Sequence, residues 1–294
     1  MKLNELEVLQ LLKNKLLKAA ESRNLKLTDD DFGSLRWKNS DKRVYYLYDY
    51  RKNLFESPSP QTELGTGIEA VRSSAAMIYN LFGETGFILD RKSFTGVEYE
   101  KTFPAIISRP PAHLDAVFFS SNNTEMFAVE AKLLEWKDSP KNLAKAYLDK
   151  SLYPSTNKNS GVFIDYFKTL IKQEEDKDGR LMHKTQRYDA IQMTIHTLAL
   201  YNHFCDISST NIKKLTLQNV VWKYDCDEYA IEEEEAARFV KDANELFVPL
   251  FKRIGIDFSI QYSTLQDFKK RIDFSKDPKR AEYLKRYDIN SDTE

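Results

Sequence analysis

The chain has 294 residues, of which 41% are hydrophobic and 13% aromatic, so it can bury a sizeable core in one large domain or two small ones. Its 44 basic and 45 acidic residues give a formal net charge of −1, which excludes a protein that coats nucleic acid through overall positive charge. An enzyme whose basic residues are concentrated locally remains possible.

Several signals point to a cytoplasmic protein that does not enter a membrane. No apolar run approaches the ~18 residues that a transmembrane helix needs. The first residues mix acids with leucines and have no small-residue cleavage site, unlike a signal peptide. The only cysteines are Cys205 and Cys226, and we expect free thiols in a reduced compartment rather than a close pair.

An amphipathic helix is expected over the first twenty residues, because leucines recur there at near-helical spacing. These leucines are Leu6, Leu9, Leu12 and Leu16. A tyrosine-rich stretch follows and ends in Pro58 and Pro60, which interrupt regular structure, so we expect a boundary near residues 57–64. The sequence therefore predicts an N-terminal helix and arm over residues 1–60 and an α/β domain with a C-terminal helical extension over 61–294.

The next part of the chain predicts one helix and three strands. Residues 66–82 carry an apolar stripe of helical period that stops at Gly83. Strand patterns then cover residues 96–106, 112–121 and 126–133. Asn122 and Asn123 predict a tight turn between the second and third strands, which would make them a hairpin.

The remainder predicts further helices around one more strand. Helices are expected over residues 140–150, 162–173 and 186–204, a strand over 213–224, and a long helix that begins at the acidic run 232–235 and ends or kinks near Pro249. This order of elements predicts an α/β core in which a hairpin carries unexpected charges.

The charges in question are Glu130 and Lys132, which interrupt the apolar strand over 126–133. Buried charges cost free energy unless they are paired, solvated or bound to a metal, and a solvated strand face is the simpler alternative. Alternate residues share a face of a strand, so these two side chains project together. Asp115 lies about as far before the expected turn as Glu130 lies after it, which predicts two carboxylates about 5 Å apart. Such carboxylates repel unless a divalent cation lies between them.

Asp115, a hairpin and then Glu130-x-Lys132 resemble the PD-(D/E)xK nucleases, a superfamily that includes many restriction endonucleases and repair nucleases. Over roughly residues 65–225, the resemblance implies a restriction-endonuclease-like αβββαβ core with a mixed central sheet flanked by helices. It also implies hydrolysis of phosphodiester bonds in nucleic acid, with DNA favoured over RNA. Asp115 and Glu130 would hold Mg²⁺, for which Mn²⁺ can substitute, and Lys132 would position or activate the attacking water. Leu114 stands where the family's proline is often found.

Other residues are candidates for supporting roles. The resemblance implies an acidic residue on the preceding helix, here Glu69, and a glutamine or tyrosine on a later helix, here Gln192. The backbone carbonyl of Ala131 can add an oxygen ligand. His113 is expected to share a strand face with the aspartate. The alternatives stay open, because Glu69 can simply favour a helix start, and core hydrogen bonding explains Gln192 and His196 equally well.

Basic residues around the motif are candidate contacts to a phosphate backbone. They include Lys141, Lys145 and Arg187. Lys141 and Lys145 are four apart and would share a helix face, which could receive phosphates or simply face solvent. The expected partner is nucleic acid, and a homodimer is compatible with the sequence. A nuclease-fold module that binds nucleic acid without cleaving it is the competing hypothesis, although an intact set of two acids and a lysine favours the enzyme.

Overall fold

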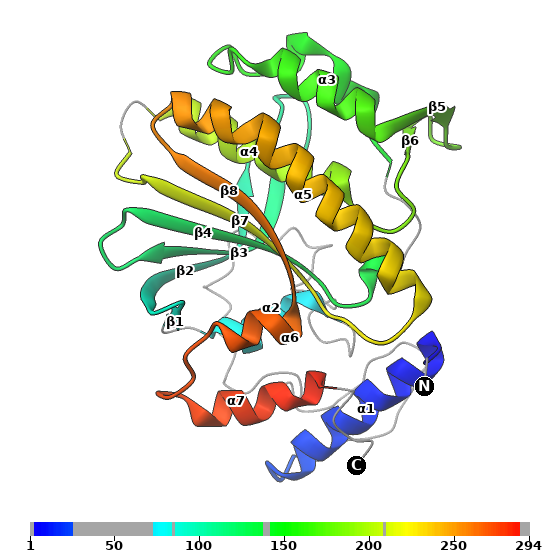
Figure 1. Cartoon of the computed structure of the whole chain (residues 1–294), viewed down its shortest axis with the longest axis vertical. Coiled ribbons are helices and arrows are strands. Elements are labelled where there is room, and N and C mark those ends of the chain that lie inside the picture. The colour runs from blue at the N-terminus through cyan, green and yellow to red at the C-terminus, as the bar shows by residue number, and fades with distance from the viewer. Residues whose placement is uncertain (1–2, 26–72, 84–85, 138–141, 208–209, 289–294) are drawn as a thin grey trace.

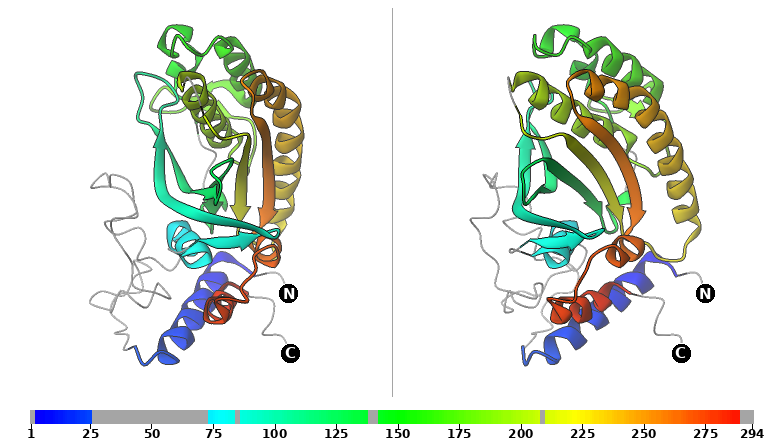
Figure 2. Two further views of the ribbon diagram at one scale, coloured as in Figure 1. Left: turned by 90° about the vertical axis from the view of Figure 1, so that its left-hand side faces the viewer. Right: turned by 60° about the vertical axis from the view of Figure 1, so that its left-hand side comes forward.

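The computed structural model describes residues 3–25, 73–83, 86–137, 142–207 and 210–288. In these ranges the protein is a mixed α/β fold whose curled sheet is flanked by helices (Figures 1 and 2). None of the helices found there combines the length and the hydropathy needed to cross a membrane. No disulfide joins Cys205 and Cys226, as expected.

The main sheet has six strands in the order β1-β2-β3-β4-β7-β8. Their bounds are Phe87–Leu89 (β1), Lys92–Phe103 (β2), Ala112–Ser120 (β3), Glu125–Lys132 (β4), Lys214–Val221 (β7) and Asp257–Thr264 (β8). Neighbours from β1 to β4 are antiparallel, whereas β4, β7 and β8 are parallel. Parallel neighbours need long crossovers, which here contain α4 (Ala190–Asp206) and α5 (Asp227–Arg253). The carboxyl ends of the three parallel strands therefore lie at one edge of the sheet.

Helices line both faces of the sheet and divide the core in two. One cluster joins α3 (Ser160–Leu170), α4 and α5 to the sheet, and the other joins α1 (Glu5–Glu21), α2 (Ser74–Phe82) and α6 (Leu265–Lys270) to the opposite face. Strand β4 serves both clusters, because Met126 and Ala128 belong to the first and Phe127, Val129 and Ala131 to the second. A short helix α7 (Pro278–Leu284) lies beside α1 (Figures 1 and 2). The alternation along β4 thus points Glu130 and Lys132 toward the side that α4 covers.

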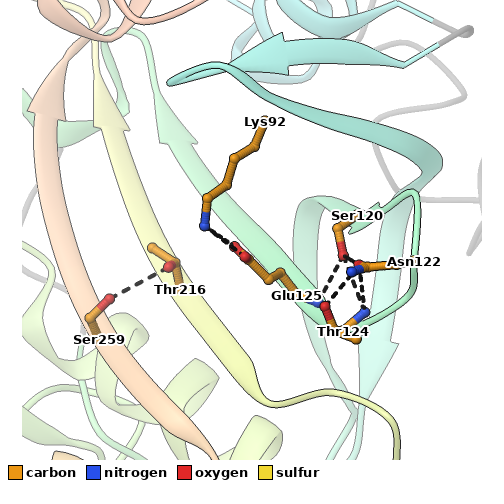
Figure 3. A network of polar contacts seen from close by, with 7 residues as sticks. All are labelled: Lys92, Ser120, Asn122, Thr124, Glu125, Thr216 and Ser259. Atoms are coloured by element: carbon orange, nitrogen blue, oxygen red, sulfur yellow. Dashed lines mark hydrogen bonds and ion pairs between the residues drawn. The ribbon is translucent and has the colours of Figure 1, made fainter.

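The turn between β3 and β4 determines which residues face each other in the hairpin. Ser120 Oγ accepts the Thr124 and Glu125 N–H groups at 3.2 and 2.8 Å, and it donates to Asn122 Oδ1 at 2.8 Å (Figure 3). Asn123 adopts a positive φ of 53°, which asparagine tolerates better than most residues. The pairing of Ala116 with Val129 is symmetrical about Asn122 and Asn123, as predicted.

Two predictions for the N-terminal part of the chain are wrong. The helix predicted from residue 66 begins at Ser74, because Ser73 is an extended N-cap whose side chain accepts the Ala76 N–H. Leu6 is 74% exposed and lies off the stripe of α1, which Val8 completes instead. The expected boundary near residues 57–64 and the arm that precedes it lie outside the described residues.

The helix predicted over residues 140–150 is wrong. Leu143 instead forms a β-bridge with Leu181, and only two short 3-10 turns follow, at Lys145–Leu148 and Lys150–Leu152. The tertiary bridge requires an extended backbone and so overrides the local helical pattern. Near the next prediction, α3 ends at Leu170 because β5 (Ile171–Glu175) begins there and pairs with β6 (Leu181–His183) in a separate two-stranded sheet.

The C-terminal third also departs from the prediction. Helix α5 begins at Asp227 rather than at residue 232 and continues through Pro249 to Arg253. Phe247, Leu250 and Phe251 are buried around the proline, so packing outweighs the one missing backbone hydrogen bond. The expected helical extension also contains β8, a sixth strand of the main sheet.

Candidate active site at the carboxyl end of β4

Glu130 is the most tightly held carboxylate of the site, with only 3% of its surface exposed. Its Oε1 accepts hydrogen bonds from Lys132 Nζ at 2.7 Å and from Gln192 Nε2 at 2.8 Å. Its Oε2 lies 3.1 Å from His196 Nε2. Gln192 and His196 are four residues apart in α4 and therefore present their side chains on the same helix face. Strand β4 and helix α4 thus hold both oxygens of one buried carboxylate.

Asp115 lies opposite Glu130 across the hairpin, one residue beyond the Ala116–Val129 pair. Its Oδ2 accepts the backbone N–H of Ala131 at 2.6 Å. The N–H and C=O of one strand residue point to the same side of the strand, so the Ala131 carbonyl also turns toward β3. The register of the hairpin therefore brings the two predicted carboxylates and the predicted backbone oxygen to one place.

The pKa values of the two carboxylates shift in opposite directions. Burial raises the pKa of Asp115 well above its usual value, and the negative charges of Glu130 and Glu100 raise it further. Burial would also raise the pKa of Glu130, but the Lys132 ammonium and then the His196 imidazole outweigh it and lower that pKa to about 2. Burial would lower the pKa of Lys132, yet Glu130 and Asp115 raise it above its usual value. An ionised Glu130–Lys132 pair thus lies beside a carboxyl whose pKa stays raised, although the Lys132 ammonium and the Ala131 N–H both oppose that shift.

The chemistry of this donor set fits a hard divalent cation. Among the described residues nothing donates a hydrogen bond to Asp115 Oδ1, and Glu130 Oε2 has only a close contact with His196 Nε2. Each carboxylate oxygen has two lone pairs, so both atoms can still bind a cation. In the part of the chain that the structure describes, no group of three or more His, Cys, Asp or Glu side chains is arranged to hold a metal. Mg²⁺ is usually coordinated by one or two carboxylates together with water and other oxygen ligands, and not by protein side chains alone. Two carboxylates and a backbone carbonyl match that coordination.

Three further side chains surround this pair. Burial lowers the pKa of His113, nearby His196 lowers it further and Glu130 opposes both, so the predicted His113 lies within electrostatic range of the site. Asp189 is the N-cap of α4, accepts the Gln192 N–H at 3.0 Å, and adds negative charge near Lys132. Glu100 lies across from Asp115 on β2, where its φ is +52°.

Two of these residues were missed by sequence reasoning. Asp189 stands directly before the helix that carries Gln192, and this N-cap position is a signal that could have identified it. Glu100 carries no comparable signal, because it is one of several charged residues on a strand that resembles a solvated edge.

Two of the three expected phosphate-binding residues are among the described residues, namely Lys145 and Arg187. Lys145 lies in a 3-10 turn rather than in the predicted helix, and it pairs with Glu175 at 2.7 Å. Arg187 is half-buried, and its backbone N–H donates to Glu235 Oε2 at 2.9 Å. Lys141 and Glu69 lie outside the described residues.

The acidic run within α5 has structural partners rather than a helix-start role. Glu235 accepts the backbone N–H groups of residues 186–188 and so holds the loop that leads into α4. Glu232 is 1% exposed and accepts the Tyr262 hydroxyl at 2.6 Å. Burial is the main reason that its pKa rises to about 7.

Comparison of the chain with protein-family models, with curated proteins and with solved structures found no match. The residues themselves and their geometry are therefore what point to an activity.

Proposed function

We propose that the chain is a Mg²⁺-dependent nuclease of the PD-(D/E)xK type that hydrolyses phosphodiester bonds in nucleic acid, with DNA as the favoured substrate. The observation that carries the proposal is the buried Glu130–Lys132 pair facing Asp115 across the hairpin. Burying an ion pair costs desolvation energy that apolar residues would avoid. A role in chemistry explains why all three groups are kept together.

The order of elements supports the same proposal. When β1, α3, β5 and β6 are set aside, the elements α2, β2, β3, β4, α4 and β7 occur in the order αβββαβ, with β7 parallel to β4. On this interpretation β1 and β8 extend a restriction-endonuclease-like core at its two edges.

Each residue has a distinct part in the proposed reaction. Asp115, Glu130 and the Ala131 carbonyl would hold Mg²⁺ or Mn²⁺, which supplies charge neutralisation and a water of lowered pKa when it is bound. Lys132 donates a hydrogen bond to Glu130, and its ammonium would position or activate the attacking water. Gln192 orients Glu130 by fixing its Oε1. His113 flanks the site from β3.

Two variants separate catalysis from metal binding. Lys132→Ala should still bind Mg²⁺, because both carboxylates remain, but nicking of supercoiled plasmid should fall by about 100-fold, the usual scale for losing a positioning or charge-stabilising group. Asp115→Ala should lose metal affinity and nicking together. Calorimetric titration with Mg²⁺ and Mn²⁺, beside the nicking assay, measures both properties.

The control is Lys168→Ala, which removes an exposed lysine of α3 and should leave both properties unchanged. Circular dichroism shows whether each variant remains folded. Undiminished nicking by a folded Lys132→Ala variant would assign Lys132 a structural role. Wild-type protein that binds DNA but does not nick it with Mn²⁺ would support the non-catalytic module instead.

A further inference from the structure

A second charged region lies between α1 and α7, which run side by side in Figures 1 and 2. It is a pocket of about 760 Å³, and no residue of β3, β4 or α4 lines it. Its basic lining residues are Lys15, Lys18, Arg23, Lys279, Lys285 and Arg286. The pocket is therefore assembled from the two ends of the described chain and is separate from the candidate active site.

The charge in this pocket is strongly unbalanced. Among the described residues, six of the lining side chains are basic and one is acidic, Glu282, which pairs with Lys285 at 2.5 Å. Lys15 donates a hydrogen bond to the Asp288 carbonyl. Like charges held around one cavity repel each other and raise the local concentration of anions. The chain as a whole carries a net charge of only −1, so this pocket is a place where positive charge is segregated.

Arg286 is a buried lining residue of the pocket whose guanidinium is fixed in orientation by two tyrosines. Only 7% of its surface is exposed, and its guanidinium donates to the Tyr283 and Tyr287 hydroxyls, each at 2.6 Å. The same guanidinium lies 5.0 and 4.5 Å from the centroids of these two rings. Phenol hydroxyls and ring faces fix the orientation of a guanidinium without removing its charge. Arg286 is thus held in place with its positive charge retained.

Helix dipoles do not explain the arrangement. Lys18 lies in the last turn of α1, where a cation is favourable. Lys279, however, lies in the first turn of α7, where a cation opposes the dipole. Both side chains are exposed, so neither was needed for the core. The helix dipoles therefore favour Lys18 but not Lys279.

We propose that the pocket between α1 and α7 binds a phosphate-rich anion, either the backbone of nucleic acid or a free polyphosphate. Its volume lies within the range of about 300 to 1,000 Å³ typical of ligand pockets. Arginine forks and lysine ammonium groups are the usual partners of phosphate oxygens. The inference does not depend on phosphodiester cleavage, because a phosphate can bind here whether or not β4 carries an active site.

The test compares two charge-reversal variants of the full chain in buffer that contains EDTA, so that metal-dependent cleavage plays no part. Lys18→Glu with Lys279→Glu changes the pocket. Lys172→Glu with Lys177→Glu makes the same change of charge at exposed residues on and beside β5, away from the pocket. Fluorescence anisotropy measures binding to a short labelled DNA duplex, and calorimetry measures binding of inorganic tripolyphosphate.

The pocket variant should bind the duplex at least ~10-fold more weakly than wild type, with a salt dependence shallower by about two counterions, while the control variant should change affinity by less than ~3-fold. Tripolyphosphate should compete with the duplex. If wild type binds tripolyphosphate but not the duplex, and only the pocket variant loses that binding, then the anion is a free polyphosphate. Equal losses in both variants, or no binding of either probe by wild type, would overturn the proposal.

Discussion

The two charged regions of this protein are built in opposite ways. At the end of β4 the charges are buried, and Glu130 has a hydrogen-bonding or charged partner at both oxygens. Between α1 and α7 the pocket contains many more charges, several of them exposed, with one carboxylate among them. Away from water each charge needs its own partner, whereas water and salt ions can screen an exposed group. A buried charge in the first region therefore constrains the fold far more than an exposed charge in the second.

The largest effect should follow from breaking the buried pair. Glu130→Ala leaves Lys132 buried without its main partner, and we expect a loss of about 3–5 kcal/mol in the free energy of unfolding at pH 7. The double variant Glu130→Leu with Lys132→Met replaces both charges by apolar groups and should recover most of that loss without recovering nicking. Urea unfolding measures both. Equal stability of Glu130→Ala and wild type would show that the pair is solvated and that the contrast between the regions is wrong.

Glu232 should show an intermediate effect that depends on pH. Its pKa rises from 4.5 to about 7 on folding, so the folded state binds the extra proton between these values. The resulting stabilisation is complete below pH 4.5 and is lost as the pH rises through about 7, a change of about 3 kcal/mol. Glu232→Gln keeps an acceptor for the Tyr262 hydroxyl but cannot titrate. Relative to wild type it should gain stability between pH 5 and pH 8 in urea unfolding, and parallel pH profiles would contradict this.

The smallest effect on stability should come from the basic pocket. Lys18→Gln with Lys279→Gln removes two exposed charges, and we expect the free energy of unfolding to change by less than about 0.5 kcal/mol per residue. Thermal unfolding in low and high salt measures this. A loss comparable to that of Glu130→Ala would show that these lysines hold the two helices together, and the difference between the regions would then disappear.

The hairpin was predictable because its information is local. The turn residues Asn122 and Asn123 set the pairing, and the period of two along a strand sets the face, so Asp115, Glu130 and Lys132 could be placed together from the sequence. Gln192 could be named as a candidate because the strong helical pattern of α4 predicts the helix that carries it. The sequence left its role open between core and site, and the hydrogen bond to Glu130 resolves its position.

What the sequence did not predict depends on contacts between distant segments. The β-bridge of Leu143 with Leu181 replaced a helix that local pattern favoured. Strand β8 was overlooked because its partner β7 precedes it by the whole of α5. The basic pocket joins residues from the first and last helices of the described chain, and no local pattern relates such residues. The basic residues of this pocket are not among those that the sequence singled out.

The symmetrical turn at Asn122 and Asn123 limits how this chain can change in length. Turns at the surface usually accept insertions and deletions, but a strand that slips by one residue exchanges its two faces. Such a slip in β4 would point Glu130 and Lys132 at the apolar side of α2 and Val129 at α4. A lengthened turn must therefore absorb its extra residues as loop and leave the register of β3 and β4 unchanged. Insertions confined to residues 121–124 should preserve the arrangement of charges, whereas a single-residue deletion within β4 should abolish it.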